Sequence, residues 1–255
     1  METYCAKYGK DLSERDFDSL SSRVIVLEKY KLVYCAIPKV ATSVWKRILA
    51  KAVNVTLTKS VHREIKDKVT YLGHFSSTKR KAILKEYKKF MFVRDPFERL
   101  LSAYRDCFWG EWKRKDPGWK NYRFKIREVL MEKAGLQIQR DADNTTFEEF
   151  VTFLYLKQND GSEYNGHWHQ QFSHCLPCQV QYDYIGHYET LQDDALFILR
   201  KFKLQDKVVF PKWHPTNTRA LLHEYYSKLS APKLSQLQKV YKEDFEAFGY
   251  TIPNF

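Results

Sequence analysis

Two stretches of the chain share one hydrophobic pattern, in which a short apolar run leads through a polar turn into helically spaced apolar positions. In the first stretch the apolar run covers 31–37 and the helical spacing covers 43–53. In the second the run covers 89–93, Pro96 follows, and helical spacing extends over 96–108. A short apolar run bounded by turn residues predicts a buried strand, and proline suits the first turn of a helix. Each stretch therefore predicts a strand, a turn and a helix.

Similar patterns predict further elements along the chain. Strands are expected at 24–27 and 182–186, and residues 1–22 are expected to be helical or irregular. Ser43 is a candidate N-cap of the first helix, and Thr145 or Thr146 is a candidate N-cap of a later one. Helical spacing predicts further helices over 78–88, 119–134, 146–157, 189–202, 218–229 and 231–247.

Strands that alternate with helices predict an α/β fold with a central, mainly parallel sheet flanked by helices. Ligands of such folds bind beyond the carboxyl ends of the strands. The chain has 255 residues and no Gly-, Pro- or Ser-rich linker, so we expect a single domain over 1–255. No apolar run reaches 18 residues and no signal peptide opens the chain, so no membrane anchor is expected within it.

Charge adds an expectation about ligands. Lys and Arg number 43 against 31 Asp and Glu, which gives a net charge of +12, with basic runs at 78–89 and 112–115. Such a surface attracts polyanions such as nucleic acid, anionic membranes or acidic glycans. Each run alone is equally well explained as a solvated helix face.

The cysteines leave several interpretations open. The chain has five, Cys5, Cys35, Cys107, Cys175 and Cys178, so at least one stays outside any intramolecular disulfide. The pair Cys175 and Cys178 has the C-x-x-C spacing of zinc and redox sites, and a local disulfide fits it as well. Two sequons, at Asn54 and Asn144, permit N-glycosylation without establishing secretion.

The first turn, from Pro38 to Ser43, has the chemistry of a phosphate site. A phosphate at a helix N-terminus meets backbone N–H groups and the positive end of the helix dipole. Lys39 adds a cation, and Thr42 and Ser43 add hydroxyl groups. The G-x-x-x-x-G-K pattern of ATP- and GTP-hydrolysing proteins is missing, which disfavours that chemistry. A plain strand-to-helix turn is the alternative.

The second turn has the same character. Arg94 leaves the predicted strand just before a helix, where a guanidinium can grip a phosphate with two hydrogen bonds. Ser102 can supply a hydroxyl from that helix, Asp95 is a candidate cap, and Arg99 is a candidate for a structural ion pair. Two such turns in one chain suit a nucleotide with phosphate at both ends.

Five segments carry a family resemblance. Tyr34 to Arg47 reads YCAIPKVATSVWKR, and Phe90 to Arg105 reads FMFVRDPFERLLSAYR. Three later segments, NGHWHQQFSHCLPC from Asn165, YDYIGHYETLQDDA from Tyr182 and YKEDFEAFGY from Tyr241, agree with them. Together they resemble the Golgi carbohydrate sulfotransferases that use 3′-phosphoadenosine 5′-phosphosulfate (PAPS). In particular, the motifs resemble those of the chondroitin and dermatan 4-O-, GalNAc 4-O- and HNK-1 sulfotransferases.

The resemblance implies a P-loop-like sulfotransferase fold and assigns the donor site. Lys39 is expected to stabilise charge on the bridging oxygen, while Arg94 and Ser102 hold the 3′-phosphate; no metal is expected. The implied donor-binding residues are Pro38, Lys39, Val40, Ala41, Thr42, Ser43, Val44, Arg94, Asp95, Pro96, Phe97, Glu98, Arg99, Leu100, Leu101 and Ser102. Val44 departs from the family, which usually has Asn at this position. The resemblance therefore predicts donor binding more strongly than it predicts turnover.

The acceptor implied by the resemblance is an anionic glycan, with the 4-hydroxyl of GalNAc as the most specific expectation, and the compartment is the Golgi lumen. An acceptor hydroxyl needs a general base. His167 is the preferred candidate; the others are His62, His74, His169, His174 and Glu189. Candidate glycan contacts are Lys79, Arg80, Lys113, Arg114, Arg123, Trp109, Trp112 and Trp168.

Three alternative functions make different predictions. A P-loop-like kinase would use ATP and magnesium. A polyanion-binding protein would bind heparin or nucleic acid in a salt-sensitive way and ignore nucleotides. A pseudo-sulfotransferase, suggested by Val44, would bind PAPS and turn it over slowly.

Overall fold

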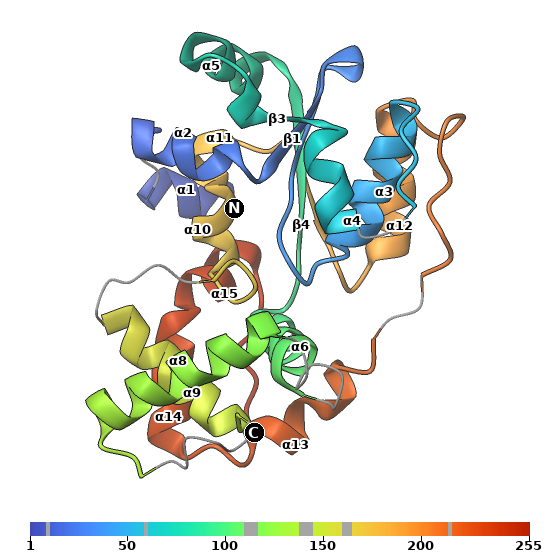
Figure 1. Cartoon of the computed structure of the whole chain (residues 1–255). Helices are drawn as coiled ribbons and strands as arrows, with labels where there is room; N and C mark the ends of the chain where they lie inside the picture. The colour runs from blue at the N-terminus through green and yellow to red at the C-terminus, as the bar shows by residue number, and fades with distance from the viewer. Residues whose placement is uncertain (9–10, 59–60, 110–116, 138–144, 160–164, 214–215) are drawn as a thin grey trace. The chain divides into compact units, whose positions relative to one another are not determined.

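The computed structural model describes residues 1–8, 11–58, 61–109, 117–137, 145–159, 165–213 and 216–255 (Figure 1). They form two compact units, one of Met1–Arg94 with Gln171–Pro215 and one of Asp95–Gln170 with Thr216–Phe255. The chain passes from the first unit to the second between Arg94 and Asp95, inside the second predicted phosphate motif.

The first unit contains a five-stranded sheet in the order β3-β1-β2-β4-β5. β2 pairs with β4 and β4 with β5 in parallel, whereas β1 is antiparallel to β2 and β3. The α/β class is confirmed, and the sheet is mixed because a short connection makes β1 and β2 a hairpin. The strands are β1 (Val24–Leu27), β2 (Leu32–Cys35), β3 (Thr70–Tyr71), β4 (Lys88–Val93) and β5 (Tyr184–His187).

Helices lie on both sides of this sheet. Figure 1 shows α3 and α12 on one side and α2, α10 and α11 on the other. The helices of this unit are α1 (Glu2–Tyr8), α2 (Glu14–Ser21), α3 (Thr42–Ala52), α4 (Val61–Glu64), α5 (Ser77–Glu86), α10 (Gln171–Cys175), α11 (Pro177–Val180) and α12 (Leu191–Lys201). None of the helices in the described part of the chain is long and apolar enough to cross a membrane.

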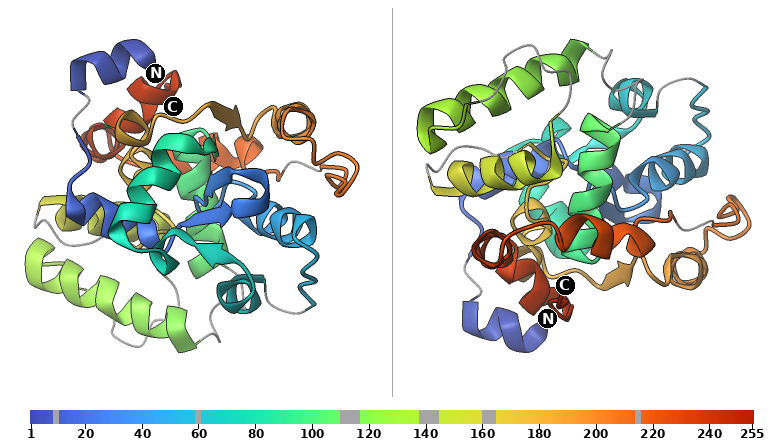
Figure 2. Two further views of the ribbon diagram at one scale, coloured as in Figure 1. Left: turned by 90° about the horizontal axis from the view of Figure 1, so that it is seen from above. Right: turned by 90° about the horizontal axis from the view of Figure 1, so that it is seen from below.

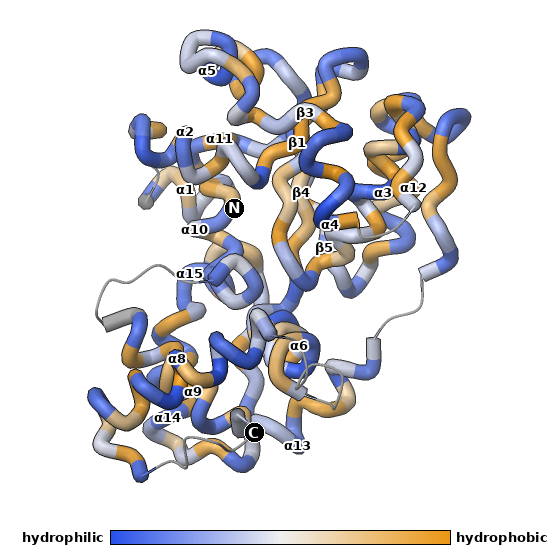
Figure 3. Tube along the Cα trace, in the orientation of Figure 1, coloured by the Kyte–Doolittle hydropathy of each residue, from blue (hydrophilic) through white to orange (hydrophobic). Residues whose placement is uncertain are grey.

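Aromatic side chains fill the space between the sheet and α3. Trp45 of α3 is fully buried, and its ring lies 5.0 Å from that of Phe90 and 5.1 Å from that of Phe92. Phe92 in turn requires Gly186 on the neighbouring strand, because a Cβ there would lie 2.4 Å from the Phe92 ring. The strands accordingly carry the hydrophobic colours in Figure 3.

Two disulfides lie among the elements on the opposite side of the sheet. Cys35 of β2 bonds to Cys175 of α10, and Cys5 of α1 bonds to Cys178 of α11. The local disulfide between Cys175 and Cys178 is therefore wrong. A C-x-x-C zinc or redox site is also excluded, because each cysteine is committed to a distant partner. Cys107 is buried and lies outside both disulfides, as the odd number required.

The second unit consists of helices around an aromatic core. Phe97, Tyr226 and Trp168 are all buried in it, and α8 and α9 lie side by side (Figure 2). Thr146 caps α9 as predicted, since its hydroxyl accepts from the N–H of Glu149 at 3.1 Å. The helices are α6 (Pro96–Phe108), α8 (Pro117–Ala134), α9 (Phe147–Asn159), α13 (Leu222–Tyr226), α14 (Ala231–Val240) and α15 (Lys242–Phe248).

Two predicted helices are divided. The stretch 231–247 is interrupted at Tyr241, which ends α14 and precedes α15. The stretch 218–229 becomes a short 3-10 turn, Arg219–Leu221, followed by α13. Tertiary packing explains the first break, because the buried Tyr241 hydroxyl donates to the carbonyl of Trp168 at 2.6 Å.

Candidate functional site

The first predicted motif forms a tight loop between β2 and α3. Lys39 and Ala41 both have left-handed backbone conformations, with φ of 72° and 50°. This conformation costs a residue with a side chain about 1–2 kcal/mol. Alternation between left- and right-handed residues turns successive N–H groups toward one concave face, a geometry that binds anions. The loop thus carries backbone strain of the kind found at functional sites.

The start of α3 differs from the sequence prediction. Ala41, not Ser43, is the N-cap residue, and it has no polar side chain with which to cap the helix. Ser43 lies in the first turn, and its hydroxyl is 2.9 Å from Nε2 of His62. The Thr42 hydroxyl donates to the carbonyl of Ile37 and thereby closes the loop. An eleven-residue helix with such a start directs its first amides and its positive dipole end at the loop.

Arg94 brings the second motif to this loop. It directly follows β4, is 1% exposed, and donates from Nη1 to the carbonyl of Lys39 at 3.3 Å. Its guanidinium lies 4.0 Å from the centroid of the Tyr188 ring. The Gln171 side chain holds its backbone, accepting from the N–H at 2.9 Å and donating to the carbonyl at 2.8 Å. The buried Arg94 therefore supports the loop 38–43, which is the predicted donor loop.

Asp95 to Ser102 belong to the second unit, and most of their side chains are buried there. Asp95 caps α6 as predicted, since Oδ1 accepts from the N–H groups of Phe97 and Glu98, both at 2.9 Å. Arg99 is 1% exposed and donates to the carbonyls of Gly166 and His169. Ser102 is half-buried. The side chains of Pro96, Phe97, Glu98, Leu100 and Leu101 are buried.

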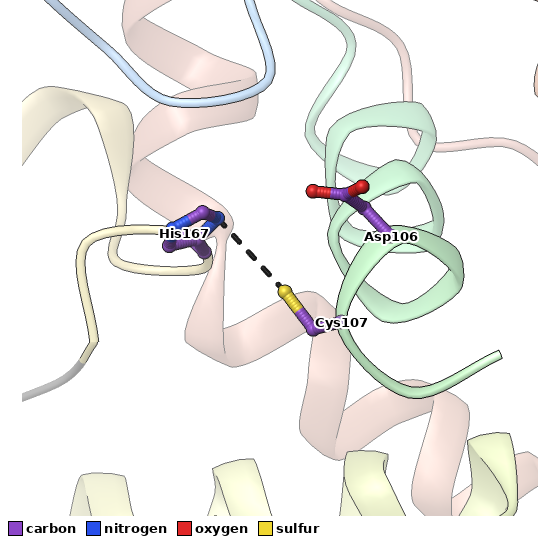
Figure 4. Close-up of side chains that lie close together, drawn as sticks. All are labelled: Asp106, Cys107 and His167. Atoms are coloured by element: carbon purple, nitrogen blue, oxygen red, sulfur yellow. Dashed lines mark hydrogen bonds between the residues drawn. The ribbon is translucent and has the colours of Figure 1, made fainter. Parts of the chain in front are cut away.

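His167, the preferred general base, lies in the second unit. Its Nδ1 is 3.9 Å from Sγ of Cys107, and the edge of its ring meets Trp119 at a centroid distance of 5.4 Å. Figure 4 shows His167 and the side chains of Asp106 and Cys107 converging from a loop and from α6. This cluster was not predicted from the sequence, because 60 residues separate Cys107 from His167.

The other candidate bases occupy different surroundings. His62 is exposed and touches the donor loop through Ser43. His174 is 3% exposed. His74 accepts from the N–H of Tyr71 at 3.4 Å, and Glu189 is exposed with its carboxylate 4.0 Å from His187. His62 is thus the candidate that the first unit brings to the donor loop.

A half-buried lysine lies in the first turns of α3. Partial burial of Lys46, together with the nearby charge of Lys66, lowers its pKa. An anion bound close by would favour the ammonium form of Lys46 and so oppose this shift.

The candidate glycan contacts divide by burial. Arg123 and Trp168 are 2% and 1% exposed, so they pack inside the second unit and are corrected from surface contacts to core residues. Trp109 is 54% exposed, and Lys79 is exposed on α5. Arg80 is half-buried, held by the carbonyls of Phe75 and Gly73. Trp112, Lys113, Arg114 and the sequon residue Asn144 lie outside the described residues.

Comparison with known proteins gives one consistent answer. Residues 22–251 match the model of the sulfotransferase family. The chain is 34% identical to carbohydrate sulfotransferase 11 of Rattus norvegicus over 241 residues, which cover 91% of this chain and 68% of that protein. It is 33% identical to carbohydrate sulfotransferase 14 of Danio rerio (95% and 66% covered) and to carbohydrate sulfotransferase 10 of Gallus gallus (91% and 68% covered). No solved structure matches significantly.

Proposed function

We propose that this chain, which belongs to the sulfotransferase family, transfers the sulfuryl group of PAPS to the 4-hydroxyl of GalNAc in chondroitin- or dermatan-type glycans. That it is a carbohydrate O-sulfotransferase follows from the family and its relatives. The finer acceptor is our proposal, supported by the five motifs that resemble the GalNAc 4-O-sulfotransferases and by the net charge of +12, which suits an acidic glycan.

The observation that carries the donor proposal is the bond from Arg94 to the carbonyl of Lys39. It brings Arg94, the residue of the second motif that belongs to the first unit, to the loop of the first motif at the carboxyl ends of β2 and β4, and ligands of open α/β sheets bind at such ends. The strained loop and the start of α3 would hold the phosphosulfate, and the Lys39 ammonium would offset its negative charge. We propose Arg94 and Ser102 as the groups for the 3′-phosphate.

Sulfuryl transfer in this site is an in-line displacement. The acceptor oxygen forms a bond to sulfur while the bond from sulfur to the bridging oxygen breaks, and 3′-phosphoadenosine 5′-phosphate (PAP) leaves. Alignment and charge stabilisation supply most of the rate in such reactions. Lys39 would stabilise the charge that develops on the bridging oxygen, and the donor loop would fix the line of attack.

The acceptor proton goes to a general base, for which we propose His167. The Cys107 thiol lies by Nδ1, so Nε2 is the nitrogen assigned to the acceptor hydroxyl. His62 competes for the role, because its Nε2 lies 2.9 Å from the Ser43 hydroxyl of the donor loop. The pH dependence of turnover in His167→Gln and His62→Gln variants separates the two.

We also propose the Golgi lumen as the compartment. The two disulfides, Cys5–Cys178 and Cys35–Cys175, suit an oxidising environment. Secretory expression of this chain followed by mapping of its disulfides tests the point, and reduced cysteines in the folded protein would contradict it.

Thermal unfolding with PAP, ATP or AMP tests the donor site. A ligand at a hundred times its Kd stabilises by about 2.7 kcal/mol, which is easily measured. PAP should raise the melting temperature, and Lys39→Ala should abolish the shift. Lys51→Ala, an exposed change in the last turn of the same helix, is the matched control. A shift with ATP alone would favour a kinase, and no shift at all would overturn the proposed donor site.

Radiolabelled sulfate transfer tests the acceptor. Chondroitin, dermatan and GalNAc-terminated oligosaccharides should be labelled, with the sulfate at the 4-position of GalNAc. PAP binding without transfer to any glycan would favour the pseudo-sulfotransferase. Labelling confined to another sugar or another hydroxyl would refute the acceptor while leaving the donor site intact.

A further inference from the structure

We propose that Asp106, Cys107 and His167 form a binding site for zinc(II) in the second unit. The carboxylate, thiol and imidazole ligand atoms all lie within 4.8 Å of one another. Two of the residues stand at the end of α6 and the third in the loop after 165, and Figure 4 shows all three turned toward one space. This site is distinct from the donor loop and shares only His167 with the proposed reaction.

The distances fit a tetrahedral ion. Zinc binds sulfur at about 2.3 Å and imidazole nitrogen at about 2.0–2.1 Å, so its tetrahedral ligands lie about 3.5 Å apart. Sγ of Cys107 and Nδ1 of His167 are 3.9 Å apart. A few tenths of an ångström of side-chain adjustment would bring the pair to coordination distance, and a carboxylate oxygen of Asp106 lies within 4.8 Å of both atoms.

The ligand set selects the metal and balances its charge. A thiolate and an imidazole favour zinc and its neighbours, whereas magnesium and calcium prefer oxygen ligands only. Thiolate and carboxylate together offset the two positive charges of the ion, which matters because Cys107 is fully buried. Three protein ligands leave the fourth position to water, as in open zinc sites.

The loop that carries His167 is held firmly enough to present a ligand. The Asn165 side chain accepts from the N–H of His167 at 3.0 Å. On either side of that residue, the buried Arg99 guanidinium donates to the carbonyls of Gly166 and His169 at 3.1 and 2.7 Å. The Trp119 ring then packs perpendicular to the imidazole. Such supporting contacts fix the orientation of a metal-ligating histidine.

Zinc on His167 would also affect the proposed reaction. An imidazole that binds metal through Nδ1 carries its proton on Nε2, and such a group cannot accept a proton from the acceptor. Zinc should therefore inhibit sulfate transfer if His167 is the general base. This consequence rests on the proposed function; the binding site itself does not.

Titration of metal-free protein with its disulfides intact, using zinc(II) or cobalt(II) alone, tests the site. Native mass spectrometry should find one ion per chain, and cobalt(II) should give a thiolate charge-transfer band. Cys107→Ser should abolish the band, and Asp106→Asn and His167→Gln should weaken binding at least tenfold. His223→Gln, an exposed histidine of the same unit, should leave binding unchanged. A band that persists in Cys107→Ser, or the lack of a stoichiometric ion, would overturn the proposal.

The two proposals fail separately. The folding of the Cys107→Ser variant is checked by its own thermal unfolding in the absence of metal and nucleotide. Zinc binding in a protein that ignores PAP would refute the donor site and keep the metal site. A normal PAP-induced shift and normal sulfate transfer without zinc binding would refute the metal site and keep the donor site. Zinc binding without inhibition would show that His167 is not the general base and would leave the metal-site proposal intact.

Discussion

The Arg94 guanidinium stacks 4.0 Å from the centroid of the Tyr188 ring. The two residues directly follow β4 and β5, and the Tyr188 N–H donates to the carbonyl of Val93 at 2.8 Å. Because β2, β4 and β5 are parallel neighbours, their carboxyl ends meet at one edge of the sheet. Tyr188 therefore positions the arginine that supports the donor loop, a role that the sequence motifs did not reveal.

Replacing Tyr188 tests this relationship. Tyr188→Leu should weaken PAP binding and destabilise the protein by about 1–2 kcal/mol, because a buried cation–π contact has that magnitude. Tyr188→Phe keeps the ring and should behave like the unchanged protein in both measurements. Denaturant unfolding and PAP titration supply the numbers. Equal effects of Leu and Phe would show that the hydroxyl, not the ring, matters.

Ala41 offers a test of backbone strain in the donor loop. Its φ of 50° penalises any side chain, so Ala41→Gly should stabilise the protein by up to about 1 kcal/mol. Ala41→Val should destabilise it, because a β-branched residue tolerates this conformation least. Both variants are compared by urea unfolding. Stabilisation by valine would mean that the loop adopts another conformation in solution.

Helices and strands were predicted well from the sequence, whereas the contacts between them were predicted less well. The helix 96–108 has the predicted bounds because Asp95, Pro96 and the apolar spacing all act locally. The prediction of Ser43 as the N-cap of α3 was wrong, because the N-cap residue is Ala41 in a left-handed conformation that local propensity does not favour. Disulfide partners lie 173 and 140 residues apart, so no spacing rule reaches them. The Arg94–Tyr188 contact likewise depends on strand order.

Gly186 provides a test of the packing behind the donor site. A Cβ at this position would lie 2.4 Å from the Phe92 ring, so Gly186→Ala should destabilise the protein by about 1–3 kcal/mol through overpacking. The double variant Gly186→Ala with Phe92→Leu should recover part of that loss, since the smaller side chain leaves room. Thermal or urea unfolding of both variants and of Phe92→Leu completes the cycle. Strictly additive losses would contradict the predicted clash.

Val44 is the position at which the donor motif departs from the sulfotransferases that it resembles. The residue is half-buried in the first turn of α3, next to Ser43. Val44→Asn would add an amide beside the donor loop, and we expect it to raise the rate of sulfate transfer severalfold. PAP affinity should change less than the rate, because in the proposed site the loop backbone and Lys39 would still hold the donor. An unchanged or lower rate would show that valine is not the weakness of this site.

Asp183 should make stability depend on acid pH. Burial opposes its charge, but hydrogen bonds from the Lys88 side chain at 2.6 Å and the Lys89 N–H at 2.9 Å prevail, so the pKa lies below its ordinary 3.8. A lowered folded-state pKa stabilises the fold above the ordinary value, and the effect is lost as pH falls through the folded-state pKa. Asp183→Asn should therefore unfold at lower urea than the unchanged protein at pH 7. As the pH falls through the folded-state pKa of Asp183 the two midpoints should converge, because both side chains are then uncharged. A constant difference between the midpoints across this range would assign the effect to packing instead of charge.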